Sequence, residues 1–193
     1  MTRWWWVRHG PTHAKAFAGW RDIPADLSDG PHLARLAEFL PQDAVLVSSD
    51  LVRATATADA IQRARHRLPH ERDLREFDFG QWDGRHFKEV SQSHPELSRL
   101  YWERPGDIAP PDGESWNDAA ARIEPVIARL SQAHAGRDIV AVAHFGTILT
   151  QVQKARGISA YDALAQKIDN LSVTCCAFDG QAWTLELVNH LTA

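Results

Sequence analysis

Short apolar runs alternate along the chain with longer segments whose apolar residues recur at helical spacing. The runs occupy residues 4–7, 44–47 and 138–143, and each is bounded by polar or loop-forming residues. Short, continuous apolar runs are typical of strands buried in the middle of a sheet. Each is followed by a segment with helical periodicity, as at residues 147–156. This alternation predicts a three-layer α/β/α fold with a mostly parallel central sheet.

Capping residues and prolines indicate where the helical segments begin and end. Apolar residues recur at helical spacing through residues 33–40, and Pro41 ends that helix. Residues 48–50 are Ser, Ser and Asp, which offer N-cap side chains for the next helix. Ser115 can cap a long helix, although Pro125 inside it predicts a kink.

Between the second and third apolar runs, residues 77–114 lose clear periodicity. Glycines and prolines punctuate short helical pieces there, so we interpret this stretch as a small helical cap over the active site. The last two apolar runs, residues 171–178 and 183–188, predict a hairpin around Asp179-Gly180. The length of the chain fits one domain over residues 1–193.

Composition and charge narrow the classes of function. The formal net charge is only -4 and the basic residues form no block, which argues against nucleic acid as a partner. No apolar stretch is long enough for a signal peptide core or a membrane span. The two cysteines, Cys175 and Cys176, are adjacent and poorly suited to a disulfide. We therefore expect a cytoplasmic protein, and the sequence leaves open whether it forms a homodimer.

Polar residues able to handle a phosphate group follow the predicted strands. Arg8 and His9 follow the first strand, Arg53 begins the helix after the second, and His144 follows the third. The carboxyl ends of parallel strands share one edge of the sheet, where ligands bind, so these side chains should meet there. Glu76 precedes the cap. The set supplies donors for a phosphoester dianion, a nucleophile and an acid for the leaving oxygen.

The predicted chemistry requires no metal or other cofactor. One positive charge about 4 Å from a phosphate oxygen contributes about 4 kcal/mol at an effective dielectric near 20, and a neutral imidazole is a competent nucleophile at pH 7. His9 and His13 are four residues apart, but Pro11 between them argues against a helical metal pair. Three other carboxylates near Glu76 are alternatives for the acid: Asp73, Asp78 and Asp83.

The segment Arg8-His9-Gly10-Pro11-Thr12 resembles the Arg-His-Gly signature of the histidine phosphatase superfamily, also called the phosphoglycerate mutase-like family. The resemblance continues, in the family's order, through most of the chain. Its further segments are residues 18–20, 25–28, 48–54, 57–58, 74–80, 112–115 and 143–146.

The resemblance implies a role for each matched residue. His9 would be the phosphorylated nucleophile and Glu76 the proton donor and later base. The residues that would hold the phosphate are Arg8, Arg53, His144 and Thr12, and those expected at the rim of the substrate pocket are Trp20, Glu114 and Ser115. The chain is most similar to short phosphatase members such as α-ribazole phosphatase, which implies a small phosphorylated metabolite as substrate.

The chain also departs from the family pattern where substrates differ. Lys15 stands where many members have asparagine, and Phe145 stands where a glycine or alanine usually follows the second histidine. An arginine often found a few residues later is missing from residues 147–150. Three alternatives stay open: a mutase-type phosphotransferase, a protein phosphatase and a phosphate-binding protein without turnover.

Overall fold

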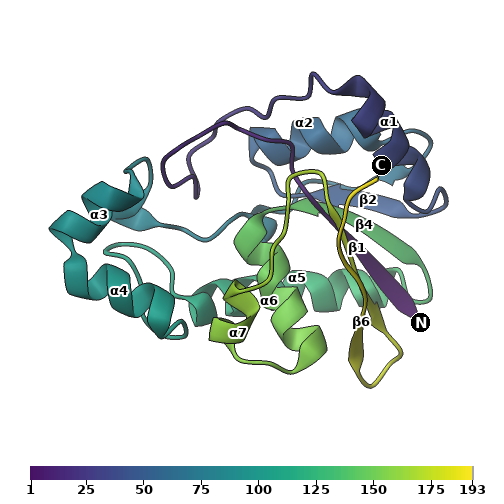
Figure 1. Cartoon of the computed structure of the whole chain (residues 1–193). Coiled ribbons are helices and arrows are strands. Elements are labelled where there is room, and N and C mark those ends of the chain that lie inside the picture. The colour runs from purple at the N-terminus through teal and green to yellow at the C-terminus, as the bar shows by residue number, and fades with distance from the viewer. Residues whose placement is uncertain (193) are drawn as a thin grey trace.

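The computed structural model describes residues 1–192, and its centre is a six-stranded sheet within that range (Figure 1). The strand order is β3-β2-β4-β1-β5-β6. Strands β3, β2, β4 and β1 pair in parallel, and β5 and β6 add an antiparallel hairpin at the β1 edge. The strands are β1 (Thr2–Arg8), β2 (Val45–Ser48), β3 (His66–Arg67), β4 (Asp138–Ala143), β5 (Val173–Phe178) and β6 (Trp183–His190).

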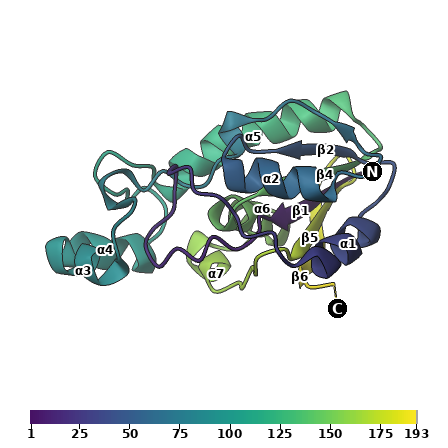
Figure 2. The same ribbon diagram turned by 90° about the horizontal axis from the view of Figure 1, so that it is seen from above.

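Helices cover both faces of the sheet, which confirms the predicted three-layer fold (Figures 1 and 2). One face carries α1 (Gly30–Phe39) and α2 (Val52–Ile61), and the other carries α5 (Trp116–Ala133), α6 (Phe145–Arg156) and α7 (Ala160–Leu164). The remaining helices, α3 (Phe87–Ser93) and α4 (Pro95–Glu103), lie away from the sheet. Of two 3-10 turns, Gly80–Trp82 packs with these helices through Trp82, whereas Arg72–Leu74 packs into the core of the α5 face through Leu74.

Each face of the sheet packs against its helices through a separate apolar core. On the α5 and α6 face, the indoles of Trp4 and Trp6 stack with their centroids 4.9 Å apart. On the other face, Leu36 of α1 packs with residues of α2 and β4. A third, smaller cluster joins α3 and α4 around Trp82, which is fully buried. The cap therefore has a core of its own.

The start of α2 differs from the sequence-based expectation. Its N-cap is Leu51, which makes no side-chain capping bond, so the prediction that residues 48–50 cap this helix is wrong. Instead, Asp22 from a distant loop accepts a hydrogen bond from the Val52 amide at 2.6 Å. Asp50 pairs with Arg75, with 2.6 Å between nitrogen and oxygen. The polar residues before α2 serve other contacts.

Helix α5 and the C-terminal hairpin were predicted from the sequence, whereas two short elements were not. Helix α5 continues as one element through Pro125, with Ser115 as the predicted N-cap. The predicted hairpin is formed by β5 and β6, and Cys175 and Cys176 are free and buried in β5. Strand β3 and helix α7 were not anticipated, because β3 has only two residues and α7 only five.

Candidate active site

The two candidate histidines meet at the carboxyl edge of the sheet. Strands β1 and β4 are neighbours, with Arg8 opposite Ala143 in the parallel register. The next residue on each strand is a histidine, and the rings of His9 and His144 lie 5.1 Å apart between centroids, tilted by 56°. The His9 amide also donates to the Ala143 carbonyl at 3.1 Å. Adjacent strand ends therefore bring together residues far apart in the sequence.

Hydrogen bonding fixes the orientation of His9. Its Nδ1 lies 2.7 Å from the Gly10 carbonyl oxygen, which can only accept, so Nδ1 carries the proton. The lone pair is then on Nε2. Burial, with the nearby guanidinium groups of Arg53 and Arg8, lowers the pKa of His9 to about 3. His9 is therefore neutral at pH 7, the form that can act as a nucleophile.

His144 is completely buried and has one free ring nitrogen. Its Nε2 lies 2.6 Å from the hydroxyl oxygen of Ser49, whereas Nδ1 has no hydrogen-bond partner among residues 1–192. Burial, with His9 and Arg53 nearby, holds the pKa of His144 well below its usual value. When Ser49 donates to Nε2, the Nδ1 proton is available to a ligand.

The two candidate arginines are anchored by backbone carbonyl groups. Arg8 Nη1 donates to the Ile168 oxygen at 2.6 Å. Arg53, near the start of α2, donates from Nη1 to Arg21 at 2.8 Å and from Nη2 to Gly19 at 2.6 Å. The Nε atoms of both arginines are buried and lack a partner in the described part of the chain. With His144 Nδ1, these atoms form a set of three unpaired buried donors, the donor cluster.

Glu76 is buried beside the histidines. Its Oε1 accepts hydrogen bonds from the Phe77 amide at 3.0 Å and the Gly146 amide at 2.9 Å. Burial outweighs these bonds and raises the pKa of Glu76, which favours the protonated acid. A Cβ at Gly146 would lie 2.5 Å from Oε1, so a glycine is needed for this approach.

Two side chains hold the loop that carries Glu76. Arg122 of α5 donates to the carbonyl oxygens of Asp73 at 2.8 Å and Glu76 at 3.2 Å, and pairs with Glu114 at 2.7 Å. The indole of Trp20 donates to the same Glu76 oxygen at 2.8 Å. Trp20 also lies against the guanidinium of Arg122, 5.7 Å from the ring centroid. The backbone at Glu76 is therefore fixed from two sides.

The residues expected at the rim have structural contacts of their own. Trp20 and Glu114 support the Glu76 loop, and Ser115 is buried at the start of α5, where it accepts from the Asp118 amide. Thr12 accepts from the Ala14 amide at 3.4 Å. Lys15 is exposed. Substrate contact by these residues stays a prediction.

Two of the three alternative acids, Asp78 and Asp83, accept hydrogen bonds from nearby loops, and the third, Asp73, is exposed. Asp78 accepts from the Gly80 amide, and Asp83 accepts from the Gly19 and Arg21 amides. Exposed His13 pairs with Asp26 at 2.8 Å. Across residues 1–192, no group of three or more His, Cys, Asp or Glu side chains is arranged to hold a metal ion.

Three supporting residues were not identified from the sequence. Ser49 was interpreted as a helix cap, but it contacts His144. Asn170 donates to the His9 carbonyl at 2.7 Å from a loop 161 residues away along the chain. Arg122 resembles an ordinary polar residue of a helix surface. Only the fold relates Asn170 and Arg122 to the site, so no local pattern predicts them.

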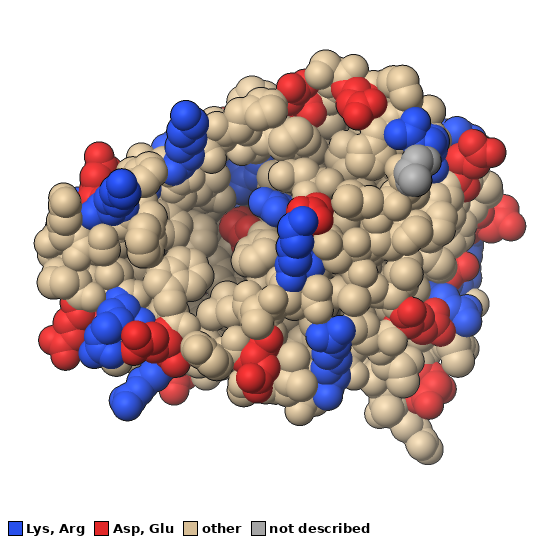
Figure 3. Space-filling model, in the orientation of Figure 1, with Lys and Arg blue, Asp and Glu red and all other residues tan. Residues whose placement is uncertain are grey.

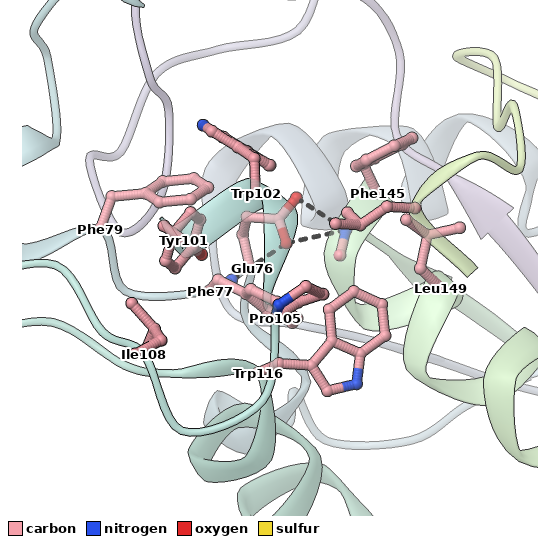
Figure 4. A pocket seen from close by; sticks show the side chains of 12 residues that line it. Glu76, Phe77, Phe79, Tyr101, Trp102, Pro105, Ile108, Trp116, Phe145 and Leu149 are labelled. Atoms are coloured by element: carbon pink, nitrogen blue, oxygen red, sulfur yellow. Dashed lines mark hydrogen bonds between the residues drawn. The ribbon is translucent and has the colours of Figure 1, made fainter. Parts of the chain in front are cut away.

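A pocket opens to solvent beside Glu76, and the space between its walls, including the part open to solvent, is about 430 Å³. Figure 3 shows the hollow in this face of the molecule, with acidic and basic atoms inside it. In Figure 4, the rings of Phe79 and Tyr101 lie on one side of the Glu76 carboxyl group, and Phe145 and Leu149 lie on the other. We call this space the aromatic pocket.

Comparison with known proteins identifies the family of this chain. Residues 4–191 match the sequence profile of the histidine phosphatase superfamily, branch 1. The chain belongs to this superfamily. It is 32% identical to phosphoglycerate mutase-like protein 4 of Arabidopsis thaliana, over 96% of this chain and 85% of that protein. It is 27% identical to the adenosylcobalamin/alpha-ribazole phosphatase of Escherichia coli, over 97% and 95% respectively.

A solved structure of a phosphatase agrees with this histidine phosphatase fold. The mycobacterial glucosyl-3-phosphoglycerate phosphatase in complex with VO3 superimposes with a TM-score of 0.85 and 29% identity, over 97% of this chain and 98% of that chain. The relatives of this histidine phosphatase superfamily member therefore include phosphatases. None of its helices within residues 1–192 is long and apolar enough to cross a bilayer.

Proposed function

We propose that the protein is a phosphatase that hydrolyses a small phosphorylated metabolite through a phosphohistidine intermediate on His9. The observation that supports this most strongly is the donor cluster of Arg8, Arg53 and His144 beside a neutral His9. Buried donors are nearly always paired in native proteins. Three unpaired donors, at the sheet edge and the start of α2, fit the oxygens of a phosphate group.

The first step transfers the phosphoryl group to the protein. The donor cluster holds the phosphate oxygens, and His9 Nε2 attacks phosphorus in line with the departing oxygen. The P–N bond forms as the P–O bond breaks. Glu76 gives its proton to the leaving oxygen, for which its raised pKa prepares it.

The second step releases inorganic phosphate. The Glu76 carboxylate now takes a proton from water, whose oxygen attacks the phosphorus bound to His9. The P–N bond breaks, its electron pair returns to Nε2, and Glu76 is again protonated. The guanidinium groups of Arg8 and Arg53 stabilise the charge spread over the equatorial oxygens in both steps. No metal takes part in this route.

The test is a trapping experiment with an aryl phosphate in excess chelator. After an alkaline quench, which preserves phosphohistidine, we expect phosphate on His9 by mass spectrometry and steady release of inorganic phosphate. His9→Ala should lose both, whereas His13→Ala, on the same loop, should retain both. Inhibition by the chelator would refute the metal-free route, and no turnover across a broad substrate panel would indicate a binding protein.

Two alternative activities fit the pocket less well. A mutase must hold a second acidic group of its substrate, yet no Lys, Arg or His side chain is among the described residues that line the aromatic pocket. A protein phosphatase needs open access for a polypeptide, whereas the cap contributes Phe79, Tyr101 and Trp102 to the wall of this pocket. The pocket favours a small ester.

A further inference from the structure

We propose that the aromatic pocket selects phosphate monoesters whose leaving group is apolar and uncharged, with a flat ring as the preferred shape. This assignment rests on the proposed function and names the substrate class of the same site. It follows from where the pocket lies, what its wall is made of and how Phe145 is placed.

The position of the pocket identifies the part of the substrate it receives. Glu76 lines the pocket, and it also lies near the guanidinium groups of Arg53 and Arg8, which act on its pKa. A phosphate in the donor cluster therefore directs its ester oxygen toward Glu76. The group beyond that oxygen then extends into the aromatic pocket, whose lining side chains are drawn in Figure 4.

The wall of the pocket is aromatic and aliphatic. Tyr101 and Trp102 of α4 meet edge to face with centroids 4.9 Å apart, and Phe79 meets Tyr101 in the same way at 6.5 Å. Trp116 presents its ring while its indole nitrogen donates to Gln153 at 2.6 Å, so this polar atom is already satisfied. Such a wall favours a ring that stacks and loses its contact with water.

The lack of cationic side chains in the pocket disfavours anionic leaving groups. No lysine, arginine or histidine side chain is among its lining residues within 1–192, and Glu76 is the sole acid. A carboxylate or a second phosphate on the leaving group would enter this space without a partner. Burying an unpaired charge is costly. Esters of glyceric acids and bisphosphorylated compounds should therefore be poor substrates.

Phe145 connects the donor cluster with the pocket. Its ring lies under the Arg8 guanidinium, 5.4 Å from charge centre to ring centroid, and also lines the pocket. Phe145 therefore adds apolar surface where the ester oxygen meets the leaving group. We therefore assign Phe145 as a specificity-determining residue.

The test compares three alkyl phosphates whose alcohols have similar acidity, so that intrinsic reactivity is matched: 2-phenylethyl phosphate, ethyl phosphate and 2-carboxyethyl phosphate. We expect kcat/KM for the phenylethyl ester to exceed both others by about tenfold or more. Similar values for all three esters would overturn the leaving-group assignment and leave the phosphatase intact. No release from any ester, together with no phosphohistidine, would contradict both proposals.

A charge placed in the wall gives a second, independent measurement. Leu164 of α7 is half-buried and lines the pocket, so Leu164→Lys should raise the use of 2-carboxyethyl phosphate relative to 2-phenylethyl phosphate by about tenfold. The matched control is Tyr161→Lys on the same helix, which is exposed and outside the pocket. An unchanged ratio in a folded Leu164→Lys protein would overturn the proposal.

A third variant separates the two contacts of Phe145. Phe145→Ala removes its contact with Arg8 for every substrate, but removes ring contacts only for the phenylethyl ester. The ratio of kcat/KM for phenylethyl to ethyl phosphate should therefore fall by about threefold to tenfold. Equal losses for both esters would show that Phe145 does not select the leaving group.

Discussion

At the scale of single residues, burial has opposite effects on the histidines and on Glu76. It lowers the pKa of His9 and His144 and raises that of Glu76, since a low-dielectric site disfavours every charged form. The nucleophile is therefore deprotonated and the acid protonated over the same pH range. This combination is what the first chemical step requires.

The pH dependence of kcat/KM should report the protonation of Glu76. The rate should fall as pH rises through its raised pKa, because the leaving oxygen then lacks a proton donor. Glu76→Gln should lower kcat/KM by about a hundredfold or more and remove this alkaline limb. Asp78→Asn, a nearby carboxylate bonded to the Gly80 amide, should keep the limb. An unchanged profile in Glu76→Gln would assign the acid to another group.

At the scale of elements, the site depends on how helices begin. Helix α6 presents the Gly146 amide to Glu76 immediately after His144, so one strand-to-helix turn serves two site residues. Helix α5 supplies Arg122, which holds the Glu76 loop. The Gly146 amide of α6 and the Arg122 side chain of α5 thus position Glu76 at the sheet edge.

Replacing Gly146 by alanine should reduce catalysis without loss of fold. The new Cβ would lie 2.5 Å from Glu76 Oε1 and so displace the carboxyl group. We expect kcat/KM to fall by about tenfold to a hundredfold, with inhibition by inorganic phosphate nearly unchanged. The matched control is Gly30→Ala in α1, where a Cβ meets nothing within 4 Å. Equal activity of both variants would show that the Gly146 contact is not needed.

The sequence predicts those parts of the structure that depend on local patterns. Apolar runs followed by Arg8-His9 and by His144 indicated strand ends, and parallel pairing then brought the histidines together. The residue that caps the N-terminus of α2 was mispredicted, because Asp22 accepts a hydrogen bond from the Val52 amide from another loop. Contacts of this kind, like that of Asn170 with His9, depend on tertiary packing. Such tertiary contacts produce no periodic pattern in the sequence from which they could be predicted.

At the scale of the whole molecule, the cap and the sheet have separate cores. Trp82, Val90 and Tyr101 form the cap cluster, whereas the sheet is packed by larger clusters on its two faces. Phe79 is a partly buried link between the cap cluster and the sheet. Such an arrangement predicts that the cap can open locally while the sheet stays folded.

Hydrogen exchange can test this separation. Trp82→Leu removes ring contacts from the cap cluster, and large-to-small core changes cost about 1 to 5 kcal/mol. Amide exchange should accelerate in α3 and α4 and stay unchanged in β1 and β4. Leu36→Ala, in the core under α1, should instead accelerate exchange in the sheet. Faster exchange in β1 and β4 of Trp82→Leu would mean that the molecule unfolds as one unit.

The separation of cap and sheet has a consequence for how such a protein can diversify. The donor cluster lies at the sheet edge and the start of α2, whereas much of the aromatic pocket comes from the cap, with further residues from α5, α6 and α7. Mutations in the cap cluster therefore have little effect on the apolar cores that keep the sheet folded. New substrate preferences can arise there by small steps while the inherited chemistry is retained, so this scaffold is well placed for gene duplication and divergence.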